Sequence, residues 1–108
     1  MKLDTPMAAA RLAALGHEHR LELFKVLVRA GRSGLTIGEL QSALGRPAST
    51  VGFHLRELVA AELVAQEREG RSVRCYASFP ALDEVLQYMK HDCCQGVTLP
   101  AFAGRRAG

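Results

Sequence analysis

The sequence predicts a mainly α-helical fold of about five helices that carries one β-hairpin of two strands. Apolar residues recur at helical spacing through most of the 108-residue chain, which predicts amphipathic helices. Residues 63–79 instead form two β-prone runs around a glycine-containing turn, the pattern of a hairpin. This hairpin directly follows two helices that a short Gly/Pro turn separates. Helix, turn, helix and hairpin in this order predict a winged helix-turn-helix architecture.

The first half of the chain contains signals for three helices. Residues 7–15 predict a short helix that Gly16 ends, and a second helix follows with apolar residues at 21, 23, 24, 27 and 28. Residues 30–35, "AGRSGL", predict a loop. The segment "TIGE" at 36–39 then has the Thr-x-x-Glu form of a capping box, so we expect a third helix from there to about Leu44.

The second half contains signals for two further helices around the hairpin. The turn "GRPAST" at 45–50 leads into a helix whose buried face holds Val51, Leu55, Leu58 and Val59. After the hairpin, Pro80 begins a last helix with an apolar stripe. We expect one domain over residues 1–96, and a flexible basic tail over residues 97–108.

Composition limits the location and the partners of the chain. We find no signal peptide pattern and no apolar run of membrane-spanning length, so we expect a cytoplasmic protein with no membrane partner. In a reducing cytoplasm, the three cysteines are expected to be free thiols. The net charge is +3, and eleven of the fourteen cationic residues are arginine, which suits a polyanionic partner without requiring one.

The helix that follows the turn at 45–50 is the candidate DNA-recognition helix. In a winged helix-turn-helix this helix enters the major groove, and the hairpin lies along the flanking backbone of double-stranded DNA. The outward side of this helix is expected to offer hydroxyls for phosphates, a glycine for close backbone approach, and side chains for base edges or the thymine methyl group. The candidate DNA-binding residues there are Ser49, Thr50, Gly52, Phe53, His54 and Arg56.

The hairpin contributes Arg68, Arg71 and Arg74 as candidate DNA contacts. Other interpretations stay open for several of these residues. His54 could be a core or interface histidine, and Phe53 could be covered by a partner subunit or by the hairpin. The hairpin arginines could be ordinary solvated charges, since acidic residues lie among them.

Two adjacent cysteines, Cys93 and Cys94, stand in "HDCCQG" where the last helix should end. A fraying helix end would let both sulfur atoms turn toward one ligand atom. Thiolates are soft ligands, and soft or thiophilic ions prefer them to carboxylate or imidazole. Cys75, on the second hairpin strand, is either a third ligand or a small buried core residue.

Three segments carry a resemblance to a known family. These are "STVGFHLREL" (49–58), "EGRSVRCYASF" (69–79) and the terminal "HDCCQG" (91–96). With the order of elements, they resemble the ArsR/SmtB family of metal- and metalloid-responsive repressors over roughly residues 8–96, and most closely its arsenic-sensing branch. The resemblance implies a homodimer, built from the first and last helices, that binds operator DNA and leaves it when an inducer binds.

The chain departs from the family pattern at known ligand positions. The stretch "LTIGEL" (35–40) lacks the cysteines of the arsenic site on the third helix, and the last helix lacks the spaced ligands of the zinc site. We therefore expect trivalent arsenic or antimony at Cys93 and Cys94, with Cys75 as a possible third ligand. Three sulfurs would hold inorganic As(III) or Sb(III), whereas two would match a monosubstituted trivalent organoarsenical. No cofactor is expected to be required.

Other classes of function compete with this one. A thiol redox or persulfide sensor on the same fold is the main alternative, although a disulfide between adjacent cysteines closes a strained ring. A third possibility is a DNA-binding dimer whose thiols bind no effector. An enzyme is not expected, because the sequence shows no nucleophile elbow and no paired carboxylates that would mark a cleft.

Overall fold

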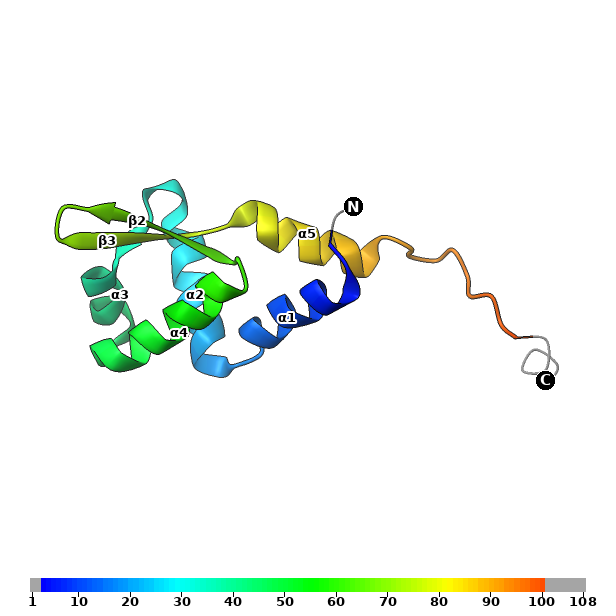
Figure 1. Ribbon diagram of the computed structural model, residues 1–108, viewed down its shortest axis with the longest axis horizontal. Helices are drawn as coiled ribbons and strands as arrows, with labels where there is room; N and C mark the ends of the chain where they lie inside the picture. The colour runs from blue at the N-terminus through cyan, green and yellow to red at the C-terminus, as the bar shows by residue number, and fades with distance from the viewer. Residues whose placement is uncertain (1–2, 101–108) are drawn as a thin grey trace.

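The computed structural model describes residues 3–100 and confirms the winged helix-turn-helix fold (Figure 1). Five α-helices and three strands are found in this part of the chain, together with one turn of 3₁₀ helix, η1. In chain order the elements are α1 (Thr5–Leu15), α2 (Glu18–Ala30), η1 (Gly31–Ser33), β1 (Leu35–Thr36), α3 (Ile37–Leu44), α4 (Ala48–Ala60), β2 (Val64–Glu69), β3 (Ser72–Ala77) and α5 (Phe79–Lys90).

Side-chain caps set the starts of three helices. The carboxylate of Asp4 accepts a hydrogen bond from the backbone N–H of Met7 at 3.0 Å, at the beginning of α1. The capping box predicted for α3 is present, with Thr36 and Glu39 each accepting from the other's backbone N–H. At the start of α5, the hydroxyl of Ser78 accepts from the N–H of Ala81.

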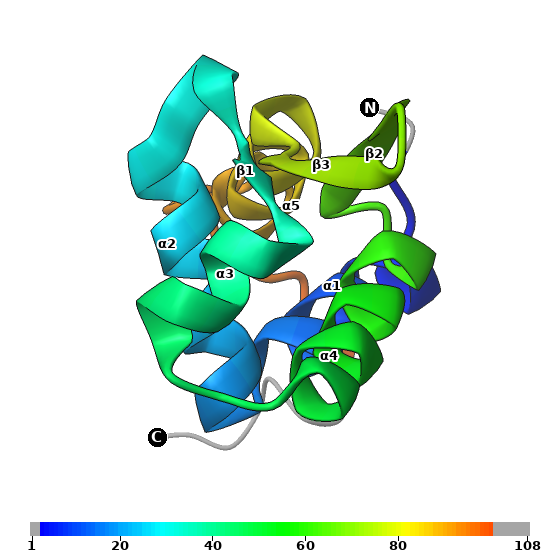
Figure 2. The ribbon, with the colours of Figure 1, turned by 90° about the vertical axis from the view of Figure 1, so that its left-hand side faces the viewer.

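The sheet contains one strand more than the sequence predicted. The hairpin of β2 and β3 forms as expected, and the two-residue strand β1 adds to the free side of β3, giving the antiparallel order β1-β3-β2. Leu35 pairs with Cys75, and Val64 pairs with Ala77. Viewed end-on, the strands lie to one side of the helix-turn-helix formed by α3 and α4 (Figure 2). The pairing of β1 anchors the hairpin to the segment that leads into α3.

A single main core lies between α2, α3, α4 and the sheet. Most of the side chains predicted from helical spacing on α2 and α4 are buried in it, but the prediction is wrong for Leu21 and Val59, which are 44% and 37% exposed. The largest of them are Leu23, Leu27, Leu40, Leu55, Leu58 and Leu63. A smaller cluster of Leu3, Ala8 and Val85 joins the start of the chain to α5. This smaller cluster and the main core together hold α5 against α1.

A buried arginine on α1 joins three parts of the chain. Arg11 is 5% exposed, and its Nη1 donates to the carbonyl of Ala81 at 2.8 Å and to the carboxylate of Glu84 at 2.9 Å, both on α5. Its Nη2 lies 3.7 Å from the carboxylate of Glu62, just after α4. No local pattern in the sequence indicates this role, because all these contacts are formed by residues far apart in the chain.

After α5, residues 91–94 form a turn, residue 95 is a bend, and residues 96–100 have no regular structure. The expected flexible tail begins here, and its residues 101–108 lie outside the described residues. Within residues 3–100, no helix combines the length and the apolar character that crossing a bilayer demands.

Candidate functional site

The first turn of α4 exposes a hydroxyl side chain to solvent. Ser49 is exposed and Thr50 is half-buried in the first turn, and Pro47 at the N-cap offers no side chain to bind the free N–H groups. Unsatisfied N–H groups and the positive end of the helix dipole favour an anion at such a position. This end of α4 is therefore suited to a phosphate.

Three further candidates of α4 keep an accessible position. Phe53 is 48% exposed, and the guanidinium of Arg20 lies 5.7 Å from the centre of its ring. Arg56 is exposed, and Gly52 is half-buried, where an added methyl group would meet the Arg56 side chain at 3.5 Å. Two side chains of different chemistry, one apolar and one cationic, are thus available on the same side of α4.

His54 corrects one expectation. The prediction that it points outward is wrong, because His54 is 5% exposed and its ring packs 4.8 Å from that of His17 at the start of α2. Burial is the main cause that lowers the pKa of His54, and the charges of His17 and Arg20 lower it further. The ring therefore lies on the inner side of α4, where its surroundings disfavour the protonated form.

The arginines of the hairpin fall into two groups. Arg68 and Arg71 are exposed at the turn between β2 and β3, where they are free to approach a DNA backbone. Arg74 is only half-buried but is bound within the chain: its Nε donates to Glu69 at 2.9 Å and its Nη1 to the carbonyl of Ser33 at 3.0 Å. The structure thus gives Arg74 a role in fixing the hairpin beside η1.

Cys93 and Cys94 lie together in the turn that follows α5. Both are free and exposed, and their sulfur atoms are 2.9 Å apart. Cys94 has a positive φ of 66°, a backbone conformation that is energetically unfavourable for residues other than glycine. The two sulfur atoms are close together in this conformation. The hydrogen bond between the thiols raises the pKa of Cys93. One atom could therefore contact both sulfurs after small side-chain rotations.

Cys75 lies in a different part of the molecule. It is fully buried in the main core, where the amide of Gln66 donates to its sulfur at 3.5 Å, and burial raises the pKa of its thiol. Cys75 precedes α5, whereas Cys93 and Cys94 follow it, and the 12 residues of α5 span about 18 Å. Within one chain the structure does not bring the three thiols together.

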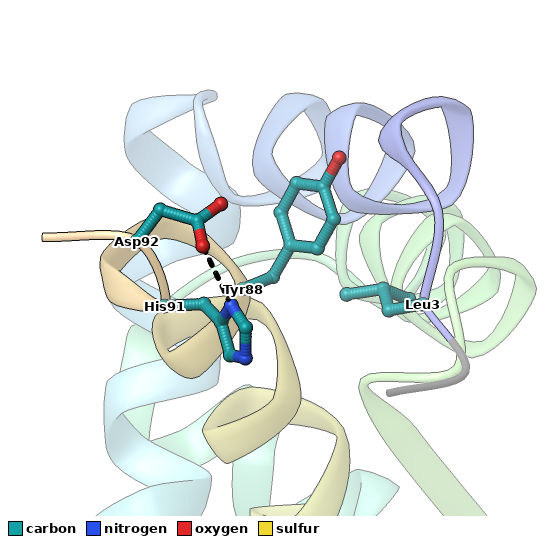
Figure 3. Close-up of a pocket in the computed structure, with 4 residues that line it drawn as sticks. All are labelled: Leu3, Tyr88, His91 and Asp92. Atoms are coloured by element: carbon teal, nitrogen blue, oxygen red, sulfur yellow. Dashed lines mark hydrogen bonds and ion pairs between the residues drawn. The ribbon is translucent and has the colours of Figure 1, made fainter. Parts of the chain in front are cut away.

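A surface cavity of about 420 Å³ lies beside the end of α5 (Figure 3). The last residue that lines it, Asp92, directly precedes Cys93 in the sequence. The cavity is lined by Leu3 from the segment before α1 and by Tyr88, His91 and Asp92 from the end of α5. The Nδ1 atom of His91 lies 3.1 Å from the carboxylate of Asp92. The cavity leaves room for an organic group beside the end of α5.

Residues that sequence reasoning missed include a histidine cluster around His54. Within residues 3–100, one group of potential metal ligands comes close enough to share an ion, and it consists of His17, His19 and His54. The spacing of His17 and His19 was visible in the sequence, but their meeting with a residue of α4 was not, because it depends on the packing of two helices.

A comparison with protein families finds one match. A family model described as a helix-turn-helix domain matches residues 15–67, from the end of α1 into β2. No match is found among curated proteins.

Solved structures share the fold over most of the chain. An ArsR-like transcriptional regulator from Rhodococcus sp. RHA1 has a TM-score of 0.74 and 26% identity, over 83% of this chain and 82% of that one. Reduced HlyU from Vibrio cholerae N16961 has a TM-score of 0.63 and 26% identity, over 83% of this chain and 92% of that one. The homodimeric winged helix-turn-helix domain Mb0332 from Mycobacterium bovis, with a TM-score of 0.63 and 20% identity over 84% and 95% of the two chains, is similar in fold.

Proposed function

We propose that the chain is a metalloid-responsive repressor of the ArsR family of transcriptional regulators, which bind DNA and are not enzymes. The match to a helix-turn-helix domain and the fold shared with the ArsR-like regulator from Rhodococcus support this proposal. In this proposal a homodimer binds operator DNA through α4 and the hairpin. Trivalent arsenic or antimony binds to cysteine thiolates at the end of α5 and releases the dimer from DNA. No cofactor is needed for DNA binding.

The observation that carries this proposal is the pair of facing thiols. Cys93 and Cys94 are exposed, free and 2.9 Å apart at their sulfur atoms. An exposed pair of soft ligands at this separation is suited to a thiophilic ion that needs only two or three bonds. Zinc would want four ligands, and the chain supplies no full set around this turn among its described residues.

The position of Cys75 favours a two-sulfur site over a three-sulfur site. A third bond from Cys75 of the same chain would require its removal from the main core, where it is fully buried. A monosubstituted trivalent organoarsenical forms two As–S bonds in place of two As–O bonds and releases two water molecules. We therefore expect such an organoarsenical to be a better inducer than inorganic arsenite, its organic group having room in the cavity beside Tyr88.

A homodimer fits the apolar residues left exposed on α1 and α5. Met7 and Leu12 on α1 are 42% and 40% exposed, and Leu86 and Met89 on α5 are 49% and 62% exposed. Burying such residues at about 25 cal/mol per Å² favours association. The similar domain from Mycobacterium bovis is described as homodimeric. A dimer also suits paired half-sites about one helical turn of DNA apart.

Arg11 supplies a route from the thiols to the DNA-binding helix. The thiols follow α5 directly, and Arg11 on α1 binds α5 through Ala81 and Glu84. The same guanidinium reaches Glu62 after α4. A ligand that changes the position of α5 would therefore also disturb the end of α4, and so the separation of the two recognition helices in a dimer.

The proposal is tested by fluorescence anisotropy on labelled DNA from upstream of the gene. The reduced wild-type protein should release this DNA when phenylarsenous acid or arsenite is added. Cys93→Ser and Cys94→Ser should bind the DNA with unchanged affinity and should not release it. Cys75→Ala is the matched control and should still release it. Release that persists in both serine variants would contradict the proposed thiol site.

A thiol redox sensor is the second candidate. Exposed, facing thiols favour it, and one of the similar structures is described as reduced HlyU. Its weakness is that a bond between Cys93 and Cys94 closes a strained ring. Mass spectrometry after peroxide or polysulfide treatment, with DNA release measured in parallel, separates the two candidates. Release by oxidant together with no response to either arsenical would favour the redox sensor.

A further inference from the structure

Three of the four histidines of the chain meet between α2 and α4. His17 is the N-cap residue of α2, His19 lies in its first turn, and His54 lies in the middle of α4. The ring centroids of His17 and His54 are 4.8 Å apart, and those of His19 and His54 are 6.1 Å apart. One potential ligand atom from each residue lies within 4.8 Å of the others. This histidine cluster is separate from the thiol pair after α5.

The buried member of the cluster lacks a hydrogen-bond partner. His54 is 5% exposed, and no hydrogen bond is formed by its Nδ1 atom within the described part of the chain. An unsatisfied buried polar atom costs about 1–3 kcal/mol. His17 also makes no side-chain cap at the start of α2, although it occupies the N-cap position. Among residues 3–100, a ligand would therefore displace no hydrogen bond at the Nδ1 atom of His54 and no side-chain cap at His17.

We propose that His17, His19 and His54 bind a divalent transition-metal ion, with Zn²⁺ as the expected one. Imidazole nitrogen is a preferred ligand of Zn²⁺, at about 2.0–2.1 Å, and three histidines leave a fourth tetrahedral position for water. Tetrahedral geometry at this bond length requires nitrogen atoms about 3.4 Å apart. The cluster has to contract by no more than about 1.4 Å per pair from its limit of 4.8 Å.

The exposed members can supply this contraction. His17 is exposed and His19 is half-buried, so both side chains can rotate toward His54, which stays fixed in α4. Two arginines near the cluster oppose a cation, but both are partly engaged. Arg20 donates to a backbone carbonyl of α1, and Arg46 lies 3.3 Å from the carboxylate of Glu22.

An ion in this position would join the start of α2 to the middle of α4. It would hold the candidate DNA-recognition helix against the main core and stabilise the folded chain by binding only to it. The inference does not rest on the metalloid proposal, because it uses none of the cysteines and none of the residues after α5.

The test uses full-length, untagged protein with Cys93→Ser and Cys94→Ser, so that the thiols cannot bind metal. Calorimetric titration with Zn²⁺ should give one ion per chain, and Co²⁺ should give the visible absorption of a tetrahedral complex. Thermal unfolding should shift to higher temperature when Zn²⁺ is added. His19→Gln or His54→Gln should weaken Zn²⁺ binding by more than about 100-fold, because losing even a supporting partner of a ligand costs 10–100-fold.

His91→Gln is the matched control, since His91 is the histidine outside the cluster, and it should bind Zn²⁺ like the parent. Should His54→Gln fail to fold, His19→Gln decides the matter, because His19 is only half-buried. Unchanged Zn²⁺ affinity in a folded His19→Gln protein would overturn the proposal. The proposal would also be overturned if the parent protein gave no heat with Zn²⁺ and no tetrahedral Co²⁺ spectrum. An ordered water molecule would then be the expected partner of the His54 Nδ1 atom.

Discussion

Gly34 occupies a position where any side chain would collide with the strand that carries Cys75. Its backbone has φ of 60° and ψ of −172°, a region that in practice only glycine adopts. A β-carbon there would lie 2.5 Å from the carbonyl oxygen of Cys75 and 2.7 Å from the ring of Tyr76. Because the nearest atom belongs to the backbone, β1 and β3 would have to separate. Gly34→Ala should therefore destabilise the hairpin and the core beneath it.

The magnitude follows from two contributions. The unfavourable backbone conformation costs on the order of 1–3 kcal/mol. Overpacking against fixed atoms costs a further 1–3 kcal/mol or so. We expect Gly34→Ala to lower the free energy of unfolding by about 4 kcal/mol, a large part of the 5–15 kcal/mol of an ordinary domain.

Gly45 provides a matched control. It ends α3 with φ of 64° and ψ of 35°, and a methyl group added there would have no neighbouring atom within 4 Å. Gly45→Ala has only the conformational cost, about 1 kcal/mol. Urea unfolding followed by circular dichroism, at one fixed protein concentration, measures both variants. If the two variants lie within about 1 kcal/mol of each other, the reasoning on steric contact is wrong.

Three further predictions concern other parts of the chain. Iodoacetamide at pH 8 should label Cys93 and Cys94 in the native protein and Cys75 only after unfolding, because burial blocks the Cys75 thiol and raises its pKa. Equal labelling of all three cysteines in the native protein, measured by mass spectrometry, would contradict the burial of Cys75. Arg11→Met removes the donors that join α1 to α5, so it should lower the free energy of unfolding in urea by about 1–3 kcal/mol and weaken the effect of arsenicals on DNA binding. A variant with unchanged stability and an unchanged response to arsenicals would contradict the proposed coupling through Arg11. Arg56→Ala should weaken DNA binding to all sequences alike and reduce the slope of log K against log salt by about 1, and an unchanged slope would mean that Arg56 does not contact phosphate.

The parts of the fold that depend on local signals could be predicted from the sequence. The capping box of Thr36 and Glu39 set the start of α3 because all its bonds lie within four residues. The hairpin followed from a positive-φ glycine, Gly70, between two β-prone runs. Strand β1 was missed because two residues carry no periodicity, and it exists only through its pairing with β3.

The outward prediction for His54 was wrong for a reason present in the sequence itself. His54 stands three residues after Val51 and four before Leu58, so helical geometry places it on the buried stripe of α4. Its polar character suggested a surface position instead. Position on the helix decides here because histidine can be buried at modest cost when it is neutral.

The candidate sites differ in how far the sequence could reveal them. Cys93 and Cys94 are neighbours in the chain, so a turn is enough to bring their sulfurs together, and the pair could be recognised without a fold. The histidine cluster depends on the packing of α2 against α4, as the separation of Cys75 from the thiol pair depends on the placement of β3 and α5. A ligand site made by neighbouring residues can form before the helices pack, whereas one shared between helices exists only in the folded state. Metal binding at the histidine cluster should therefore be coupled to folding, and arsenical binding at the thiol pair should persist in the unfolded chain.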